Sequence, residues 1–187
     1  MTQTDTAVRG DGGLDPAALV ASRVLDVPDF PKPGIMFKDL MPLFADGDVF
    51  RQVIDGIVAH HGTDSFDVVA GVEARGFLMA AAIGYATGAG VVPVRKAGKL
   101  PRQVHAISYA LEYGEATLEV HADAFVAGQR VLVVDDVLAT GGTAGAALEL
   151  VERSGGTVVG FTVLLELASL RGRQQLAPRD VHAILTV

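Results

Sequence analysis

A run of four apolar residues constrains the fold of this chain more than any other feature. Val131, Leu132, Val133 and Val134 are consecutive β-forming residues, and a strand that is apolar on both faces must be covered on both faces. Two aspartates follow, and a glycine-rich turn then leads into an apolar pattern with helical spacing. A strand, a short turn and a helix in this order are typical of a sheet flanked by helices. The sequence therefore predicts an α/β protein.

The same alternation runs along most of the chain. We expect strands over residues 67–71, 90–95, 130–135, 157–165 and 181–187. We expect helices over residues 80–86 and 143–154, a helix that Asp15 caps and that reaches Leu25, and another that Asp48 caps. Because strands alternate with helices, the fold class is α/β with a central parallel sheet flanked by helices.

Two segments depart from this order. Residues 30–43 contain prolines and Gly34, which break regular elements, yet they are rich in apolar side chains. A loop of this kind either packs on the core, which its composition slightly favours, or covers a flat apolar ligand. Residues 107–111 and 116–120 are two β-like runs around a short turn, and they predict an inserted antiparallel hairpin that acts as a flap over a site at the strand ends.

Composition limits the classes of function. With 187 residues, of which 50% are hydrophobic, we expect a disordered tail over residues 1–13 and a single domain over residues 14–187. The net charge of −7 argues against nucleic-acid binding, which needs a basic surface. The lack of cysteine excludes disulfides, thiol nucleophiles and cysteine–zinc sites. Because no signal peptide or membrane-length apolar run is visible, we expect a cytoplasmic protein with no membrane partner.

The turn after the apolar strand is suited to a phosphate. A glycine-rich turn that enters a helix offers free backbone N–H groups and the positive end of the helix dipole. Thr140 and Thr143 add hydroxyl groups, and no Walker sequence follows. Asp135 and Asp136 can accept hydrogen bonds from vicinal sugar hydroxyls and can favour a nearby Mg²⁺. The alternative is a turn that the aspartates merely cap, but the combined pattern favours a ribose 5-phosphate pocket.

The apolar strand, the two acids and the Thr-Gly-Gly-Thr turn together resemble the phosphoribosyltransferase family, in which this motif binds 5-phosphoribosyl 1-diphosphate. Further segments resemble adenine phosphoribosyltransferases in particular, namely residues 30–39, 73–77, 94–101 and 108–114. The resemblance implies the type I phosphoribosyltransferase fold, with an N-terminal hood loop and a hairpin flap. It also implies pentosyl transfer in purine salvage, from 5-phosphoribosyl 1-diphosphate to adenine with AMP and diphosphate as products, by a cytoplasmic homodimer that uses Mg²⁺.

The resemblance also assigns roles to residues. Those implied for 5-phosphoribosyl 1-diphosphate are Arg75, Arg95, Lys96, Lys99, Asp135, Asp136, Ala139, Thr140, Gly141, Gly142 and Thr143. Mg²⁺ is implied to bind mainly through the diphosphate, with no dedicated metal ligands from the protein. The loop that contains Arg75 is implied to hold an unusual cis peptide bond.

The implied adenine site is in the proline-rich loop. The main chain of Met36 reads the edge of the base, and Phe37 stacks on it. Lys38 stands where the family has an arginine, and lysine lacks the planar fork of a guanidinium. Glu112, in the hairpin flap, is the implied carrier of a proton for the purine.

Two other readings compete with this one. A transferase for xanthine, guanine or orotate would share the phosphate motif, but the proline-rich loop and the hairpin favour adenine. A regulator that senses 5-phosphoribosyl 1-diphosphate would need a DNA-binding domain, and no basic helix-turn-helix is visible. The five histidines show no metal-ligand spacing, and no role is assigned to them.

Overall fold

The structure, a computed structural model, describes residues 15–110 and 114–187. The tail expected over residues 1–13 and the hairpin tip with Glu112 lie outside the described residues, so both expectations stay predictions. None of the described helices is long and apolar enough to cross a membrane.

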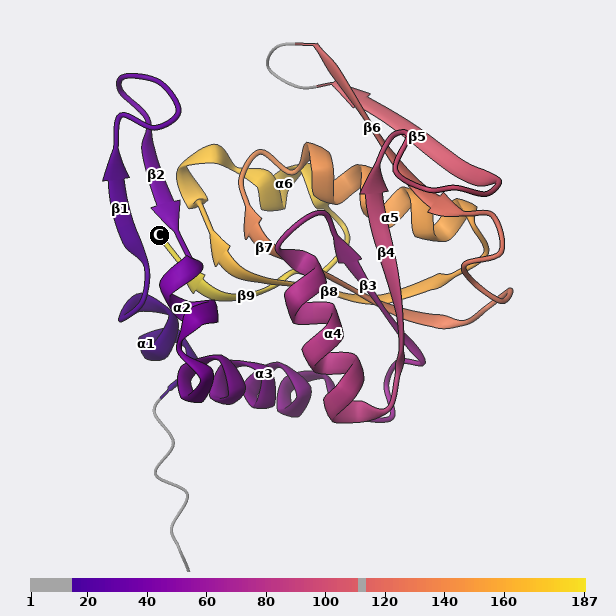
Figure 1. The fold of residues 1–187 in the computed structure, drawn as a ribbon, viewed down its shortest axis with the longest axis horizontal. Helices are drawn as coiled ribbons and strands as arrows, with labels where there is room; N and C mark the ends of the chain where they lie inside the picture. The colour runs from indigo at the N-terminus through magenta and orange to yellow at the C-terminus, as the bar shows by residue number, and fades with distance from the viewer. Residues whose placement is uncertain (1–14, 111–113) are drawn as a thin grey trace, which may run out of the picture.

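A sheet of seven strands forms the centre of the molecule, in the order β5-β6-β4-β3-β7-β8-β9 (Figure 1). Five neighbouring strands are parallel, namely β4 (Gly90–Lys96), β3 (Val68–Val72), β7 (Arg130–Leu138), β8 (Thr157–Glu166) and β9 (His182–Thr186). The two others, β5 (Val104–Ala110) and β6 (Glu115–His121), form an antiparallel hairpin that joins β4 through Arg95 and Lys96. The predicted parallel sheet and inserted hairpin are therefore confirmed.

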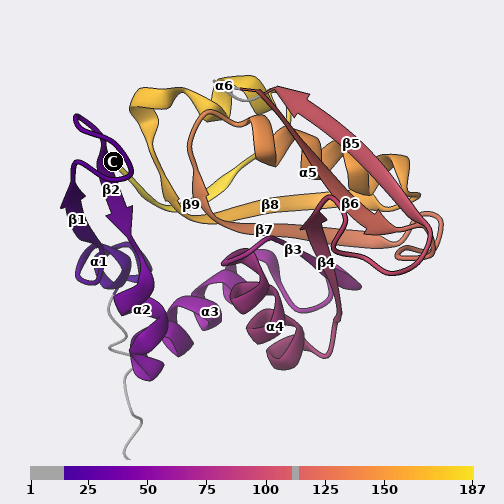
Figure 2. The same ribbon diagram turned by 45° about the horizontal axis from the view of Figure 1, so that its top comes forward.

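Helices cover both faces of this sheet (Figure 2). One face carries α1 (Pro16–Ala21), α2 (Met41–Ala45), α3 (Gly47–His61) and α4 (Gly76–Thr87), and the other carries α5 (Gly142–Arg153). The short helices η1 (Ala168–Leu170) and α6 (Gly172–Leu176) follow β8. Alternation along β7 joins the two layers, because Leu132 and Val134 pack in the α3 and α4 cluster while Val131 and Val133 pack in the α5 cluster.

The N-terminal segment contains a second sheet that sequence patterns missed. As predicted, the Asp15 carboxylate caps α1 by accepting a hydrogen bond from Ala17 N at 3.3 Å. The extension of this helix to Leu25 was wrong, because α1 ends at Ala21 and Leu25 begins β1 (Leu25–Pro28). Strand β1 pairs with β2 (Met36–Asp39), inside the segment predicted to lack regular structure. The backbone N–H and C=O groups of these short strands form hydrogen bonds with each other. No local sequence pattern predicts a pairing of this kind.

The cap of α3 is Asp46 rather than the expected Asp48. The Asp46 carboxylate accepts a hydrogen bond from Val49 N at 3.1 Å and pairs with Arg23 at 2.9 Å. Gly47 occupies the first helical position, so Asp48 lies in the first turn, where it faces Arg51 at 3.7 Å. The Arg23 guanidinium and the Val49 N–H lower the pKa of Asp46, and the cap therefore also ties α3 to the end of α1.

We predict that Asp46→Ala lowers the melting temperature by several degrees, because it removes both the helix cap and the Arg23 pair. Asp48→Ala is the matched control, and it should change the melting temperature much less, since it removes only an exposed pair and a charge in the first turn. Thermal unfolding followed by circular dichroism measures both. Equal losses in the two variants would contradict the assignment of the cap.

Candidate active site

A cavity of about 680 Å³ opens at the carboxyl ends of the central strands. Strand β3 lies between β4 and β7. The chain passes from β3 to β4 on one side and, after the β5–β6 hairpin, returns to β7 on the other side. This reversal makes the edge a topological switch point where ligands bind in open α/β sheets. The residues that line the cavity are Phe37, Lys38, Glu73, Ala74, Arg75, Lys96, Tyr109, Ala116, Leu118, Asp135, Asp136, Val137, Leu138, Ala139, Thr140, Gly141, Thr143, Ala144 and Leu167.

The two adjacent aspartates lie within β7 rather than after it. Strand β7 was expected to end at residue 135, but it continues to Leu138 because β8 extends beside it, with Val137 opposite Leu165. Asp135 and Asp136 are therefore held by strand pairing on a fixed backbone. Asp136 is buried, with its side chain only 8% exposed, and Asp135 is partly buried.

The environments of the two carboxylates differ. Asp135 Oδ1 accepts a hydrogen bond from Asp136 N at 2.9 Å. Burial, and then the negative charge of Asp136, raise the pKa of Asp135 well above its ordinary value. Asp136 forms an ion pair with Arg75 Nε, although no described group donates a well-oriented hydrogen bond to its buried Oδ2 atom. Asp135 therefore keeps its proton more readily than an ordinary aspartate, whereas Asp136 faces a guanidinium.

The glycine-rich turn connects β7 to the N-terminus of α5. Gly141 has a φ of +91°, and a Cβ atom there would lie 2.7 Å from the carbonyl oxygen of Gly172. At Gly142, by contrast, a Cβ atom would make only ordinary contacts, the nearest at 3.5 Å from the Tyr109 ring. The turn therefore requires glycine at residue 141 for two reasons and packs directly on α6.

Thr143 and Tyr109 connect this turn to the hairpin. Thr143 Oγ1 donates a hydrogen bond to the hydroxyl oxygen of Tyr109 at 3.0 Å, and both residues line the cavity. Sequence reasoning assigned no role to Tyr109. Its place in a β-like run predicted the hairpin, but the strand register, which pairs it with Ala116, decides what it contacts.

The basic residues are divided between the cavity and its margin. Arg75 and Lys96 line the cavity, whereas Arg95 and Lys99 are not among the lining residues. Arg95 Nε donates to Glu73 Oε2 at 3.2 Å, and an Arg95 amino group donates to the Lys99 carbonyl at 3.4 Å.

Glu73 organises this margin. Its Oε2 atom also accepts from Lys96 N at 3.0 Å, and this backbone hydrogen bond, followed by Arg95, lowers the pKa of Glu73. The Glu73–Ala74 peptide bond is cis, as the resemblance implies.

Only part of the expected adenine site reaches the cavity. Phe37 and Lys38 line it, but Met36 is not among the lining residues, and its side chain is exposed. The Phe37 ring meets the Phe30 ring edge-on at 5.1 Å and lies 5.9 Å from the Arg75 guanidinium. Lys38 Nζ donates to the Asp26 carboxylate across the β1–β2 pair at 2.7 Å.

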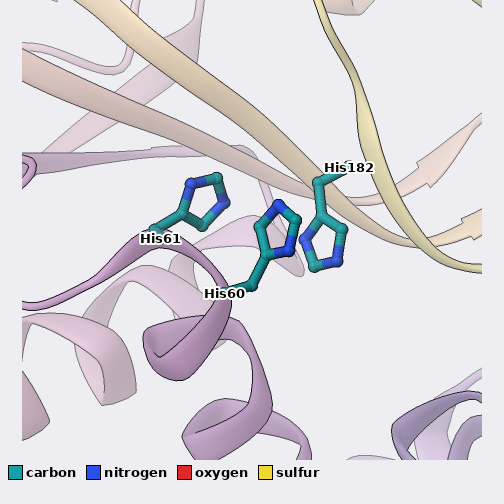
Figure 3. A group of neighbouring side chains, drawn as sticks. All are labelled: His60, His61 and His182. Carbon is teal, nitrogen blue, oxygen red and sulfur yellow. The ribbon is translucent and has the colours of Figure 1, made fainter.

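A cluster of histidines lies outside the cavity. Figure 3 shows His60 and His61 at the end of α3 beside His182 of β9, and their nearest ring nitrogens lie within 4.8 Å of one another. Sequence spacing did not reveal this cluster, because α3 and β9 are distant in the chain.

The arrangement of these rings is unsuited to a shared metal ion. The His60 and His182 rings are stacked at 3.6 Å with an interplanar angle of 4°, and in-plane lone pairs of parallel rings do not converge on one ion. The buried Thr162 hydroxyl lies 2.6 Å from His61 Nε2 and 3.4 Å from His182 Nδ1. Burial lowers the pKa of His61 to about 4. His61 therefore packs in this cluster as an uncharged ring at neutral pH.

We predict that Gly141→Ala lowers the free energy of unfolding by about 1–3 kcal/mol, the usual cost of a strained backbone conformation, and that contact with Gly172 adds to this loss. Gly142→Ala is the matched control and should be neutral or slightly stabilising, since residue 142 is helical and has room for a methyl group. Urea unfolding measures both. Similar free energies of unfolding for the two variants would contradict the support of the turn by α6.

We predict that Asp135→Asn raises the melting temperature of the ligand-free protein at pH 7 to 8. The pKa of Asp135 is raised in the folded state above its ordinary value of 3.8, so the folded state binds this proton more tightly than the unfolded state does. Wild-type stability is then lost as pH rises from about 4 through the folded pKa. The advantage of the variant should therefore shrink as the pH falls towards 4.

Asp136→Asn is the comparison for this experiment. It removes the charge that faces Arg75 and should give no such gain in stability. Melting curves across a pH series follow both variants. A gain from Asp135→Asn that does not depend on pH would show that ionisation of Asp135 is not its cause.

Comparisons with known proteins agree with this geometry. The phosphoribosyl transferase domain family matches residues 45–184. A protein named adenine phosphoribosyltransferase from Salinispora arenicola is 77% identical over the full length of both chains. The crystal structure of adenine phosphoribosyltransferase from Rhodothermus marinus has a TM-score of 0.86 at 45% identity, covering 92% of this chain and 98% of its own.

The adenine phosphoribosyltransferase of Saccharomyces cerevisiae was solved with adenine and an imino-altritol bisphosphate. It has a TM-score of 0.87 at 37% identity, covering 91% of this chain and 98% of its own. Family, sequence relatives and fold agree, and the resemblance stated from the sequence is confirmed. The chain belongs to the adenine phosphoribosyltransferases, the pentosyltransferases of purine salvage that form AMP.

Proposed function

We propose that the cavity binds 5-phosphoribosyl 1-diphosphate and adenine side by side and transfers the phosphoribosyl group to the base. One observation carries the proposal: a phosphate-type turn, two adjacent carboxylates, cationic side chains and the Phe37 ring line a single cavity. The yeast relative that was solved with adenine and a bisphosphate supports the same combination of ligands.

The 5-phosphate would bind at the turn of residues 139–143. The N–H groups of the turn and the N-terminus of α5 offer hydrogen bonds and a partial positive charge. The Thr140 hydroxyl can donate a further hydrogen bond, and the Thr143 hydroxyl can donate to the phosphate in place of Tyr109. The phosphate does not react, so its role is to hold the ribose in position.

The ribose hydroxyls would bind at Asp135 and Asp136. Because burial and the neighbouring charge raise the pKa of Asp135, this carboxyl can keep a proton and donate a hydrogen bond to one hydroxyl. Asp136, which faces Arg75, can accept from the other hydroxyl. One protonated and one ionised carboxyl group, side by side, can thus bind the two adjacent hydroxyl groups of the ribose.

The diphosphate would lie against Arg75 and Lys96, with Arg95 and Lys99 at the margin. When the bond from C1 of the ribose to the diphosphate oxygen breaks, the electron pair leaves with the diphosphate, and these cations stabilise its charge. The adenine nitrogen then forms the new bond to C1.

Magnesium is compatible with these residues. Asp135 and Asp136 carry oxygen atoms of the kind that Mg²⁺ prefers, although Asp136 Oδ2 already faces the Arg75 guanidinium. The ion would bind mainly through the diphosphate. When bound, Mg²⁺ would supply positive charge to the diphosphate oxygens.

Adenine would occupy the end of the cavity near Phe37. The partly buried ring offers a face for stacking on the base, and the main chain of Met36, beside it in β2, would read the edge of the base. For Glu112 we keep the proton-carrying role that the family resemblance implies.

A homodimer is part of the proposal. Helix α4 carries no charged residue, and Leu78 and Tyr85 on it are 44% and 94% exposed. The neighbouring strand β4 exposes Val91 at 46%. A helix that is apolar on all sides is normally covered, and a second copy of the chain would cover it. The prediction of a cytoplasmic enzyme rests on the sequence alone.

The test is AMP formation from adenine and 5-phosphoribosyl 1-diphosphate, with hypoxanthine, guanine, xanthine and orotate as alternative bases. We expect adenine to be used in strong preference, and Asp136→Asn to raise the KM for 5-phosphoribosyl 1-diphosphate. Asp123→Asn, which changes an exposed pair with Arg102, is the control. Tight binding of 5-phosphoribosyl 1-diphosphate without turnover of any base would instead indicate a sensor.

We predict that Glu112→Gln lowers kcat by about 100-fold, the low end of general acid–base contributions. Affinity for 5-phosphoribosyl 1-diphosphate should stay the same, because that substrate is proposed to bind at residues 135–143. Glu115→Gln, a neighbouring exposed glutamate at the start of β6, is the matched control. Unchanged turnover of Glu112→Gln across a pH series would exclude Glu112 as the proton carrier.

A further inference from the structure

The short helix α6 packs on the outer side of the phosphate-type turn. A Cβ atom at Gly172 would overlap the carbonyl oxygen of Ala139 and would lie 3.0 Å from Gly141 N. Conversely, a Cβ atom at Gly141 would lie 2.7 Å from the carbonyl oxygen of Gly172. The two backbones are therefore in direct contact, and a shift of α6 must move the turn.

One arginine ties α6 to the ends of two strands. Arg173 Nε and one of its amino groups donate to both oxygens of the Glu166 carboxylate, at 3.1 Å, 3.1 Å and 2.6 Å. The other amino group donates to the carbonyl of Val181, just before β9, at 2.6 Å. These four hydrogen bonds fix both the position and the direction of the guanidinium.

The anchor of this contact is rigid. Glu166 ends β8, its side chain is only 7% exposed, and it pairs with Leu138 at the end of β7. Leu167 N donates to the Leu138 carbonyl at 2.9 Å, and Leu167 lines the cavity. A carboxylate buried this deeply is costly to leave unpaired, so the Arg173 contact is held firmly in place.

The backbone that leads into α6 is unusual. Arg171 has a φ of +56°, a left-handed conformation that residues with side chains rarely adopt. Such a conformation persists where the surrounding contacts over-determine it, and it is frequent near functional sites. The Arg173 contacts, which begin two residues later, supply that constraint.

We propose that Arg173, held by Glu166, is a positioning residue that sets the geometry of the 5-phosphate-binding turn through the contact of Gly172 with Ala139 and Gly141. Arg173 is not among the residues that line the cavity, so it acts through the turn and not on the substrate. This inference rests on the proposed function, because it assigns the phosphate to that turn.

The test is the steady-state kinetics of AMP formation by Arg173→Met. Misplacement of the turn should raise the KM for 5-phosphoribosyl 1-diphosphate by about tenfold or more, while the KM for adenine changes little. A merely structural role would instead reduce the fraction of folded enzyme, which lowers the apparent kcat and leaves both KM values unchanged.

Three further variants sharpen this test. Arg173→Lys keeps the charge but loses the fork, so it should rescue the KM only in part. Glu166→Gln should raise the same KM and should add little in the Arg173→Met background, since the two residues act as one unit. Arg179→Met is the control, because Arg179 pairs with the more exposed Glu152 of α5 at 2.7 Å and is not among the residues that line the cavity.

Hydrogen exchange provides a readout that is independent of activity. In Arg173→Met, or in Glu166→Gln if the first variant does not fold, the amides of residues 139–143 should exchange faster than in wild type and in Arg179→Met. An unchanged KM together with unchanged exchange of this turn would overturn the inference. If the wild-type protein neither binds 5-phosphoribosyl 1-diphosphate nor forms AMP, the proposed function fails instead.

Discussion

The burial of two adjacent carboxylates at the end of β7 is the constraint on which the active-site region depends. Removing a carboxylate from water is unfavourable unless a partner or a proton compensates it. Asp136 faces Arg75, which the end of β3 supplies, and Asp135 responds with a raised pKa. The ligand-free protein thus keeps an electrostatic cost at this site, which a ligand with hydroxyl groups would relieve. A site of this kind exchanges stability for binding.

The order of the strands makes this arrangement possible. Because β3 lies between β4 and β7, the residues after β3 face the carboxylates of β7 on one side and the basic end of β4 on the other. Glu73 accepts hydrogen bonds from Arg95 and from Lys96 N, which leaves Arg75 to pair with Asp136. The loop after β3 therefore holds Arg95 at the margin of the cavity through Glu73, while Arg75 of the same loop pairs with Asp136.

The sequence predicted those parts of the structure that local patterns encode. The apolar residues 131–134, the glycine turn and the helix after it were correct because each depends on neighbouring residues. Sequence patterns missed the β1–β2 pair and the continuation of β7 to Leu138, because each depends on pairing with another strand. They also missed the cap at Asp46, because the start of α3 differs from the predicted start by a short shift along the chain. The contacts of Tyr109 and the tie between Glu166 and Arg173 depend on register and on packing of α6, which no local pattern contains.

Arg75 joins the parts of the cavity that the proposed reaction must bring together. Its guanidinium lies 5.9 Å from the centre of the Phe37 ring, on the proposed base side, and its Nε atom pairs with Asp136, on the ribose side. The hood contributes no comparable free charge here, because Lys38 Nζ is bound to Asp26 across the β1–β2 pair. A lysine at this position therefore serves to hold the hood together, and the cation that contacts the aromatic ring comes from the loop after β3. The same guanidinium thus lies near the Phe37 ring and compensates the buried carboxylate, so the proposed base, sugar and diphosphate sites share one cation.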